Sequence, residues 1–356
     1  METYRVIGIM SGTSLDGIDI ALCDFSLNDS KDWSFDIIHT STIPYTNDVK
    51  NKLTNAIGFL GIDLMLLNNE LGNIIGQSIN NFIGEFKIKK NSIDFISSHG
   101  HTIFHQPEKK LTTQIGNGAN ISSKTKIPVI CDFRSTDISL NGTGAPLVPI
   151  GDKLLFQEYG FCINLGGIAN ITYEKKNKTI AYDICPVNII LNKLISELDK
   201  DFDNEGNIER TGKINDLLLN ELNKLDYYNY PPPKSLGIEW VNTKVFPILN
   251  KYNIEINDKL RTVVEHAAIQ ISKVIYGTDE KTLITGGGTY NTFLIERIIK
   301  LSNCNIVIPS AEIIEFKEAL VFAFLGVLRY RNEINCLSTV TGATHNNIGG
   351  CIYNAF

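Results

Sequence analysis

One stretch just before the middle of the chain, residues 161–188, constrains the fold most strongly. It reads FCINLGGIANITYEKKNKTIAYDICPVN, which predicts a strand (161–165), a Gly166-Gly167 turn and two further strands (168–173 and 179–182) leading to Asp183. Paired glycines carry no Cβ, so their backbone N–H groups can approach an anion closely, as in a phosphate-binding turn. A carboxylate at the end of the neighbouring strand would project into the same space and could act as a general base. An ordinary hairpin with an exposed aspartate is the alternative for this stretch.

The size and composition of the chain indicate a globular protein that acts on small molecules. At 356 residues it is longer than one hydrophobic core usually serves, so we expect two domains. Hydrophobic residues make up 43% of the sequence and charged residues 20%, which is typical of soluble proteins. The formal net charge of -6, with no basic run that contains interleaved aromatic residues, argues against a nucleic-acid partner.

The cysteines and the N-terminus indicate a cytoplasmic protein. The seven cysteines are scattered and never arranged as C-x-x-C, which predicts reduced thiols rather than a disulfide framework or a thiolate zinc site. The apolar run at the N-terminus is too short for a signal peptide, and no apolar segment approaches the length of a membrane span. We therefore expect neither export nor a membrane partner.

The first strand signal, residues 4–10, runs into a small polar turn and returns along residues 18–25. The tip of this hairpin offers hydroxyls, backbone N–H groups and a carboxylate, which could hold a phosphate group and its magnesium ion. A plain turn rich in serine, threonine and glycine is the alternative. No P-loop of the form G-x-x-x-x-G-K-[ST] is present. The candidate residues of the tip are Ser11, Gly12, Thr13, Ser14, Asp16 and Gly17.

Three histidines, at positions 99, 101 and 105, follow a strand predicted at residues 95–98. No acidic or thiolate side chain lies at ligand spacing nearby, so hydrogen bonding to a polar ligand or between imidazoles is favoured over metal binding. The segment 132–147 then combines Arg134 and Asp137 with a glycine-rich loop. Such fixed donors and acceptors suit a polyhydroxylated ligand, and a domain linker has a similar composition.

A second glycine run, Gly286-Gly287-Gly288, lies between a strand predicted at 282–285 and a helix. This arrangement suits a nucleotide, because the backbone can lie flat against a base or ribose and the helix N-terminus favours anions. Lys234 follows three prolines and could reach a phosphate or be solvated, with solvation slightly favoured. Glu318, in the first turn of a predicted helix, is typical of a residue that complements the helix dipole.

The order of these features resembles that of the actin-like sugar kinases, with a phosphate hairpin first, then a glycine turn with one acid, and an adenosine turn last. More closely, the chain resembles the anhydro-N-acetylmuramic acid kinase family over nearly its whole length. The motifs that carry this resemblance are GIMSGTSLDGID (8–19), SHGHTIFHQP (98–107), QIGNG (114–118), DFRSTDISLNGTGAPLVP (132–149), NLGGIANIT (164–172), PPPKS (231–235), TGGGTYN (285–291), FKEALVFAFLG (316–326) and TVTGA (339–343).

The resemblance implies an α/β fold of two actin-like, ribonuclease H-like domains. Each would hold a mixed sheet flanked by helices, with ATP in the interdomain cleft. We expect an N-terminal domain of residues 1–133 plus 341–356 and a C-terminal domain of residues 134–340. The resemblance also suggests a homodimer.

The family's reaction converts anhydro-N-acetylmuramic acid, ATP and water to N-acetylmuramic acid 6-phosphate and ADP, in the recycling of peptidoglycan. By resemblance, Asp183 is the catalytic acid that deprotonates the attacking water, and Asp16 with the rest of the hairpin tip holds the phosphates and Mg²⁺. The other residues that the resemblance implies are Gly166, Gly167 and Asn170 for the phosphates, Gly286, Gly287, Gly288 and Asn291 for the nucleoside, and Glu318, Arg134, Asp137, Thr102 and His105 for the sugar.

The sequence departs from the family pattern at several positions. Where the family reads T-G-P-G-N after the catalytic acid, this chain has Ile184, Cys185, Pro186, Val187 and Asn188, which makes the next helix start bulkier. The other departures are His101, Thr143, Asn192, Leu236 and Ile238. They indicate a divergent branch with the same reaction or a kinase for a related amino sugar.

Two readings outside the family's reaction stay open. One is a catalytically inactive actin-like nucleotide sensor or scaffold, and the other is an ordinary kinase of an open hexose. The joint presence of Asp183, Asp16 and Glu318 favours the enzyme, because a binding protein needs only the nucleotide turns.

Overall fold

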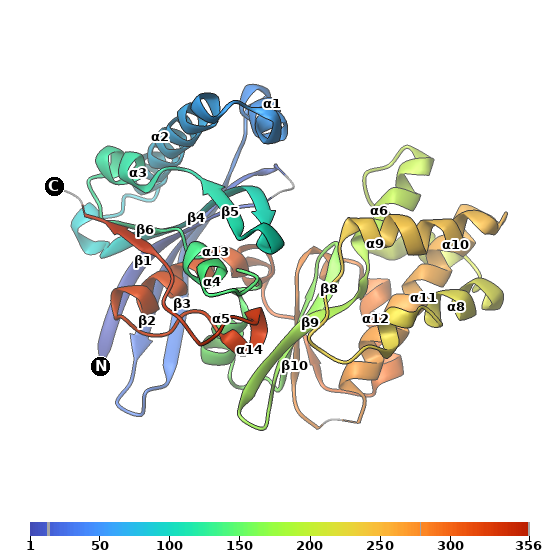
Figure 1. Ribbon diagram of the computed structural model, residues 1–356. Coiled ribbons are helices and arrows are strands. Elements are labelled where there is room, and N and C mark those ends of the chain that lie inside the picture. Colours follow the sequence, from blue (N-terminus) through green and yellow to red (C-terminus); the bar gives the residue numbers. More distant parts are fainter. Residues whose placement is uncertain (13–14, 278, 355–356) are drawn as a thin grey trace. The chain divides into compact units, whose positions relative to one another are not determined.

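The chain folds into two compact α/β units. The structure is a computed structural model that describes residues 1–12, 15–277 and 279–354. Unit 1 comprises Met1–Leu155 together with Phe316–Phe356, and unit 2 comprises Phe156–Glu315. Each unit contains one mixed sheet with helices packed on it, which confirms the predicted α/β class (Figure 1).

Unit 1 is built on a seven-stranded sheet with the order β12-β6-β4-β1-β2-β3, and β5 pairs with β4. Its β1 pairs antiparallel with β2 and parallel with β4, so this sheet is mixed. The strands are β1 (Glu2–Ser11), β2 (Gly17–Leu27), β3 (Trp33–Pro44), β4 (Phe95–Gln106), β5 (Leu111–Ile115), β6 (Val129–Cys131) and β12 (Cys351–Tyr353). The α-helices are α1 (Asn47–Asn55), α2 (Gly61–Glu85), α3 (Gly118–Thr125), α4 (Ser135–Ser139), α5 (Pro149–Leu155), α14 (Ser338–Thr341) and α13 (Ala311–Tyr330), which belongs to unit 1 from Phe316 on.

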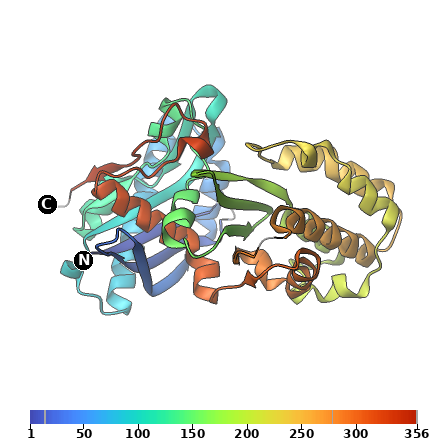
Figure 2. The same cartoon turned by 90° about the horizontal axis from the view of Figure 1, so that it is seen from below.

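Helices cover the unit 1 sheet on both faces (Figures 1 and 2). On one face, α2 buries Leu64, Leu67 and Leu71 at helical spacing against strand residues such as Ile7 and Ile20. On the other face, Phe324 of α13 packs against Phe25 and Trp33, with ring centroids 5.4 and 5.1 Å apart. Gly8 of β1 is necessary for this packing, because a Cβ there would collide with the carbonyl of Ala319.

Unit 2 is built on a five-stranded sheet with the order β11-β10-β7-β8-β9. Helices gather on one face of this sheet and enclose a core that includes Ile163, Ile171, Leu191, Val264 and Leu294 (Figures 1 and 2). The strands are β7 (Phe161–Leu165), β8 (Ile168–Lys175), β9 (Lys178–Pro186), β10 (Thr282–Thr285) and β11 (Ile306–Val307). The α-helices are α6 (Asn188–Ile195), α7 (Asn207–Thr211), α8 (Asp216–Asn223), α9 (Ile238–Trp240), α10 (Phe246–Lys251), α11 (Ile256–Ile275) and α12 (Thr292–Ser302).

The bounds of the two units differ from those expected from the sequence, 133/134 and 340/341. Segment 134–155 and most of α13 pack with the first sheet, and three contacts hold them there. Arg134 donates hydrogen bonds to His99 of β4, Ser97 of β4 donates to the carbonyl of Phe322, and a buried ion pair of 2.7 Å joins Lys317 of α13 to Asp152 of α5. A glycine-rich loop at 141–147 therefore lies within unit 1.

None of the described helices is long and apolar enough to span a membrane.

Candidate active site

The predicted catalytic residue Asp183 lies in a row of polar side chains across three neighbouring strands. Asn164 of β7 is the register partner of Asn170 of β8, and Asn170 is the partner of Asp183 of β9. Register partners point to the same face of a sheet, whereas their neighbours Ile163 and Ile171 belong to the hydrophobic core on the other face. A β-bulge follows at once, so that Ile184 is the extra residue of β9. Bulges of this kind redirect a side chain next to a functional site.

The carboxylate of Asp183 is half-buried and held through one oxygen. The backbone N–H of Leu236 donates to Oδ2 at 2.8 Å, and the described part of the chain provides no hydrogen-bond donor to Oδ1. Burial raises the pKa of the Asp183 carboxyl, and the Leu236 hydrogen bond partly opposes this by stabilising the charged form. A carboxylate with one fixed and one open oxygen, and with a raised pKa, has the properties of a general base.

The Gly166-Gly167 turn lies directly after β7 and is joined to the start of α6. The N–H groups of Val187 and Ile189 donate to the carbonyl of Gly167 at 2.9 and 3.1 Å. Neither glycine has a positive φ, and a Cβ at either would meet only ordinary van der Waals contacts, the nearest at 3.4 Å for Gly166 and 3.7 Å for Gly167. Within the described structure neither backbone conformation nor packing requires glycine here, and the close approach of a ligand is a reason that remains.

The bulky residues that replace the family's threonine (Ile184) and two glycines (Cys185 and Val187) are buried in the core. Ile184, Cys185 and Val187 are buried among the side chains of α6 and α11, on the face of the sheet that carries Ile163 rather than Asp183. Their extra volume is therefore accommodated by packing around α6 and α11.

The second glycine run lies beside the first, because β10 pairs in parallel with β7 and Thr285 is opposite Asn164. Gly286 has φ +87°, and a Cβ on it would lie 2.5 Å from Oδ1 of Asn164; a Cβ on Gly288 would lie 2.8 Å from that of Leu165. Gly287 is exposed, and a Cβ on it would meet nothing within 4 Å. Packing and backbone conformation thus explain why residues 286 and 288 are glycines. The space beside Gly287 is open, and a bound group could occupy this open cradle.

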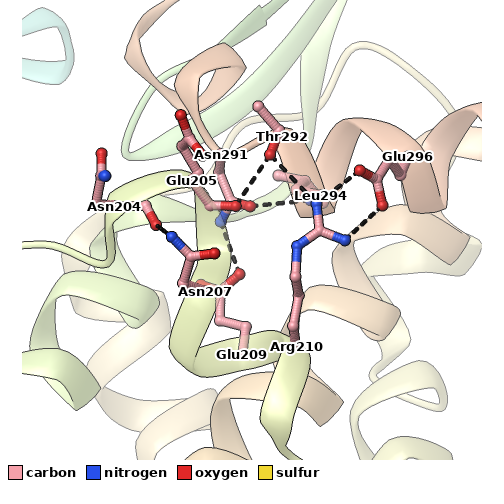
Figure 3. Close-up of polar contacts among 9 residues, drawn as sticks. All are labelled: Asn204, Glu205, Asn207, Glu209, Arg210, Asn291, Thr292, Leu294 and Glu296. Carbon is pink, nitrogen blue, oxygen red and sulfur yellow. Dashed lines mark hydrogen bonds and ion pairs between the residues drawn. The ribbon is translucent and has the colours of Figure 1, made fainter.

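Asn291, predicted to contact the nucleoside, caps the helix that follows the glycine run (Figure 3). Its Oδ1 accepts from the N–H of Leu294 at 2.9 Å, and its Nδ2 donates to Glu209 Oε2 at 2.8 Å. Glu205 and Arg210 also contact the beginning of α12. The Glu205 carbonyl accepts a hydrogen bond from Thr292 Oγ1 at 3.1 Å, and Arg210 forms an ion pair with Glu296 at 2.6 Å. The contacts of Asn291 are those of a residue that positions the turn.

Glu209 is an acid that the sequence analysis did not single out. Its side chain is 1% exposed, and burial raises its pKa to about 7. The charge of Asp203 also raises this pKa, whereas the Asn291 hydrogen bond and the charges of Arg261 and Arg210 lower it. Gly206 is required beside it, because its φ is +71° and a Cβ there would lie 2.8 Å from Glu209 Oε2.

In unit 1, the predicted phosphate hairpin is the connection between β1 and β2. Ser11 is buried, and its hydroxyl lies 2.7 Å from the Tyr45 hydroxyl and 2.9 Å from His101 Nδ1. Asp16 is exposed, and Gly17 passes so close to the backbone of Ile43 that it has no room for a side chain. Thr13 and Ser14 lie outside the described residues.

His99 and Arg134 form a second polar group in unit 1. Arg134 donates from Nε and from a terminal nitrogen to His99 Nε2 at 3.0 and 2.9 Å, so Nε2 carries no proton, and the proton on Nδ1 faces the Gly100 carbonyl at 2.9 Å. Burial and the positive charge of Arg134 hold the pKa of His99 well below its ordinary value. No group of three or more His, Cys, Asp or Glu side chains among the described residues is placed to hold a metal ion.

The predicted sugar-side residues fall into accessible and enclosed positions. Asp137 is fully buried, and Oδ1 accepts from Thr341 Oγ1, Asn347 Nδ2 and Cys336 Sγ at 2.8 to 3.0 Å while Oδ2 accepts from the N–H of Gly144. Its geometry supports an anchor for the loop 141–147. Glu318 and His105 are exposed, and Thr102 is half-buried. The surroundings of Glu318 raise its pKa through partial loss of water, an effect that the charge of Arg134 opposes.

Two of the sequence departures are likewise tied into the fold. His101 is the buried partner of Ser11, and the Thr143 hydroxyl donates to the carbonyls of Ala145 and Thr341 at 2.7 and 3.0 Å. Leu236 contributes its backbone N–H to Asp183, so its side chain does not decide that contact.

Other contact residues were not found by sequence reasoning. Asn164 could have been found, because it is a polar residue in an apolar strand two positions before the glycine pair. Tyr45 and Glu209 gave no usable signal, since each is brought to its partner only by tertiary packing.

Comparison with known proteins assigns the chain to a family. The family profile described as anhydro-N-acetylmuramic acid kinase matches residues 4–355. The chain belongs to the anhydro-N-acetylmuramic acid kinase family. It is 34% identical over 368 residues to the anhydro-N-acetylmuramic acid kinase of Mannheimia succiniciproducens, covering 96% of each chain. It is also 34% identical over 365 residues to that of Sulfurovum sp., covering 99% of this chain and 100% of the relative.

Membership confirms the family predicted from the sequence and the prediction that the chain is an enzyme of the kinase class. Among solved structures, the activator of the 2-hydroxyisocaproyl-CoA dehydratase from Clostridium difficile with bound ADPNP is 13% identical. It aligns over 92% of this chain and 97% of its own with a TM-score of 0.45, a likeness too low to argue from.

Proposed function

We propose that this protein uses ATP and water to convert 1,6-anhydro-N-acetylmuramic acid to N-acetylmuramic acid 6-phosphate, as its family membership indicates. The water oxygen bonds to the anomeric carbon, and the bond from that carbon to O6 breaks with its electron pair on O6. O6 then bonds to the γ-phosphorus as ADP leaves with the bridging oxygen. Water thus supplies the anomeric hydroxyl, and O6 carries the phosphoryl group.

The observation that carries this proposal is the state of Asp183. Its Oδ2 is fixed by Leu236, its Oδ1 is open, and its carboxyl has a raised pKa. We assign Oδ1 as the atom that takes a proton from the attacking water. The proton gained there can assist the departure of O6 and is released to solvent when O6 bonds to phosphorus, so one carboxylate serves both ends of the ring opening.

The remaining roles are positioning and charge compensation, as phosphoryl transfer requires. In unit 2, Gly166, Gly167, Asn170 and Gly287 fit an approach by the nucleotide, since a Cβ on any of these three glycines would meet no atom closer than 3.4 Å. Gly286, Gly288 and Asn291 shape that turn. In unit 1, Ser11, Gly12, Thr13, Ser14 and Gly17 are assigned to the phosphates, and Glu318, Arg134, Thr102 and His105 to the sugar, with Asp137 as the anchor of the loop 141–147.

Magnesium is the metal that this donor set fits. Mg²⁺ is usually held by one or two carboxylates together with substrate phosphates, and Asp16 is an exposed carboxylate on the β1–β2 hairpin. When bound, the ion would neutralise charge on the phosphates.

The decisive experiment follows both halves of the reaction at once. In H₂¹⁸O, we expect Mg²⁺-dependent ADP release that requires the anhydro sugar, with one ¹⁸O entering the product at the anomeric carbon. Asp183→Asn should reduce kcat by orders of magnitude. Absence of the label would refute ring opening by water, and sugar-independent or absent ADP release would instead support the nucleotide sensor.

A related amino sugar is the second candidate substrate. Ile238, one of the positions at which the chain departs from the family pattern, is 43% exposed. Running the labelling assay over a panel of anhydro and open amino sugars, with an open hexose included, ranks these substrates by kcat/KM.

We further propose a cytoplasmic location, on the scattered cysteines, and a homodimer, on family resemblance. Light scattering of the purified protein tests the dimer.

A further inference from the structure

One segment after α8 contacts Asp183 through three different groups. The hydroxyl of Tyr227 donates to the Asp183 carbonyl at 2.6 Å, the N–H of Asp183 donates to the Lys234 carbonyl at 3.3 Å, and the N–H of Leu236 donates to Oδ2 at 2.8 Å. Both backbone polar groups and one carboxylate oxygen of Asp183 are thus bonded to residues 227–236.

Asp183 needs these partners because of its place in the sheet. β9 is an edge strand of the five-stranded sheet, and the bulge at Ile184 interrupts its pairing with β8. Backbone groups at such a position lose partners in the ladder and must find others. Tyr227, Lys234 and Leu236 supply them, and we call these three residues the Asp183 brace.

The brace is itself fixed. Tyr227 is 5% exposed and packs against Trp240 and Tyr228, with ring centroids 5.5 and 5.8 Å away. Lys234 closes the segment on itself, because its Nζ donates to the Tyr227 carbonyl at 3.1 Å and lies 4.6 Å from the centre of the Tyr227 ring. Lys234 is thus half-buried, with its ammonium group directed at Tyr227 within the same segment.

We propose that the Asp183 brace sets the direction of the catalytic carboxylate. Tyr227, through its hydroxyl, is then a positioning residue that acts on Asp183. This inference rests on the proposed role of Asp183. The brace engages every polar group of Asp183 except Oδ1, which leaves that oxygen with a defined direction. The contact uses only the backbone N–H of Leu236, so the departure from the family pattern at this position leaves it intact.

The matched experiment compares Tyr227→Phe with Tyr228→Phe. The two tyrosines are adjacent, Tyr227 buried and Tyr228 half-buried, and each variant loses one hydroxyl contact, which for Tyr228 is with His266 Nε2 at 2.8 Å rather than with Asp183. We expect Tyr227→Phe to lower kcat by roughly ten- to a hundredfold, because small misplacements of reacting groups are that costly, with KM for ATP unchanged. Tyr228→Phe should keep the wild-type kcat. It should lower Tm at least as much as Tyr227→Phe does, because it leaves Nε2 of the buried His266 without a hydrogen-bond partner.

The pH profile provides a readout that a merely structural role would not change. A loosened Leu236 contact stabilises the charged carboxylate less, so the acid limb of kcat should move to higher pH in Tyr227→Phe and stay in place in Tyr228→Phe. Equal kcat losses in the two variants, or a wild-type kcat and profile in Tyr227→Phe, would overturn the brace. Asp183→Asn separates the two proposals. If Asp183→Asn retains activity, the proposed role of Asp183 as general base is wrong. If Asp183→Asn is inactive while Tyr227→Phe behaves like the wild type, only the proposed role of the brace is wrong.

Discussion

At the scale of single residues, Asp183 and Glu209 show how one physical effect gives two acids different uses. Burial raises the pKa of both carboxyls. Asp183 keeps one oxygen without a hydrogen-bond donor among the described residues, whereas Glu209 is enclosed and bonded to Asn291. The environment of each group, rather than its chemistry, therefore separates a candidate base from a positioning residue.

The raised pKa of Asp183 predicts the pH dependence of the reaction. A general base works only when ionised, so kcat should fall as pH drops through a pKa above the ordinary 3.8 of an aspartate. Measuring kcat from pH 4 to pH 8 tests this. An acid limb at or below 3.8 would contradict the burial argument.

Glu209 predicts a pH-dependent stability. Its pKa is about 7 in the folded chain against an ordinary 4.5, so the folded state binds the proton more tightly and loses stability as pH rises from about 4.5 to 7. Glu209→Gln should therefore be more stable than wild type at pH 8, by about 3 kcal/mol at most, and nearly equal to it at pH 5. Urea unfolding at the two pH values measures this difference.

Glu296→Gln is the matched control for that prediction. It changes an exposed acid of the same cluster whose pKa is lowered by its hydrogen bond to Arg210, so it titrates below this window. Its effect on stability should be the same at pH 5 and pH 8. An unchanged pH dependence in Glu209→Gln would show that Glu209 is not the titrating group.

At the scale of elements, the site in unit 2 is produced by strand pairing. The parallel pairing of β10 with β7 brings the glycine run at 286–288 beside the Gly166-Gly167 turn, and antiparallel pairing aligns Asn164, Asn170 and Asp183. Two of the elements also carry a residue that redirects or caps them: the bulge at Ile184 interrupts β9, and Asn291 caps the start of α12.

The three glycines of the second run should respond differently to substitution. Gly286→Ala should destabilise the fold by roughly 1–3 kcal/mol, because its φ of +87° and ψ of 161° suit glycine alone. Gly287→Ala should leave Tm nearly unchanged and raise the KM for ATP, since its Cβ would enter the open cradle. Thermal unfolding and ATP titration of the two variants check this. A wild-type KM in Gly287→Ala would argue against nucleotide contact there.

At the scale of the whole molecule, the chain divides its candidate residues between two compact units. Asp183 and both glycine turns belong to unit 2, whereas the β1–β2 hairpin, Arg134 and Glu318 belong to unit 1. The proposed reaction needs residues from both units.

Hydrogen exchange with and without a non-hydrolysable ATP analogue and Mg²⁺ tests this division of labour. Peptides covering residues 8–19, 164–172 and 285–291 should all gain protection, because bound ligand suppresses opening of the backbone that it contacts. Peptides from α8, which carries none of the assigned residues, serve as the control. Protection confined to one unit would contradict a contribution from both.

Much of this protein can be predicted from its sequence. Strand patterns that end in glycines, and the order of those motifs, are local features that predict the α/β class, the turns and Asp183. Packing between segments is not local, so the sequence left the bounds of the two units and the roles of Asn291 and Asp137 to the structure.

The tertiary structure alone decided what surrounds the predicted residues. Tyr227 and Leu236 lie more than forty positions from Asp183 and reach it only because the segment runs along an edge strand. Glu209 resembles its polar neighbours in the sequence and becomes a buried acid only through the packing of α7. A sequence determines the type and spacing of chemical groups, whereas burial and hydrogen-bond partners, which set pKa and direction, depend on which distant segments come together.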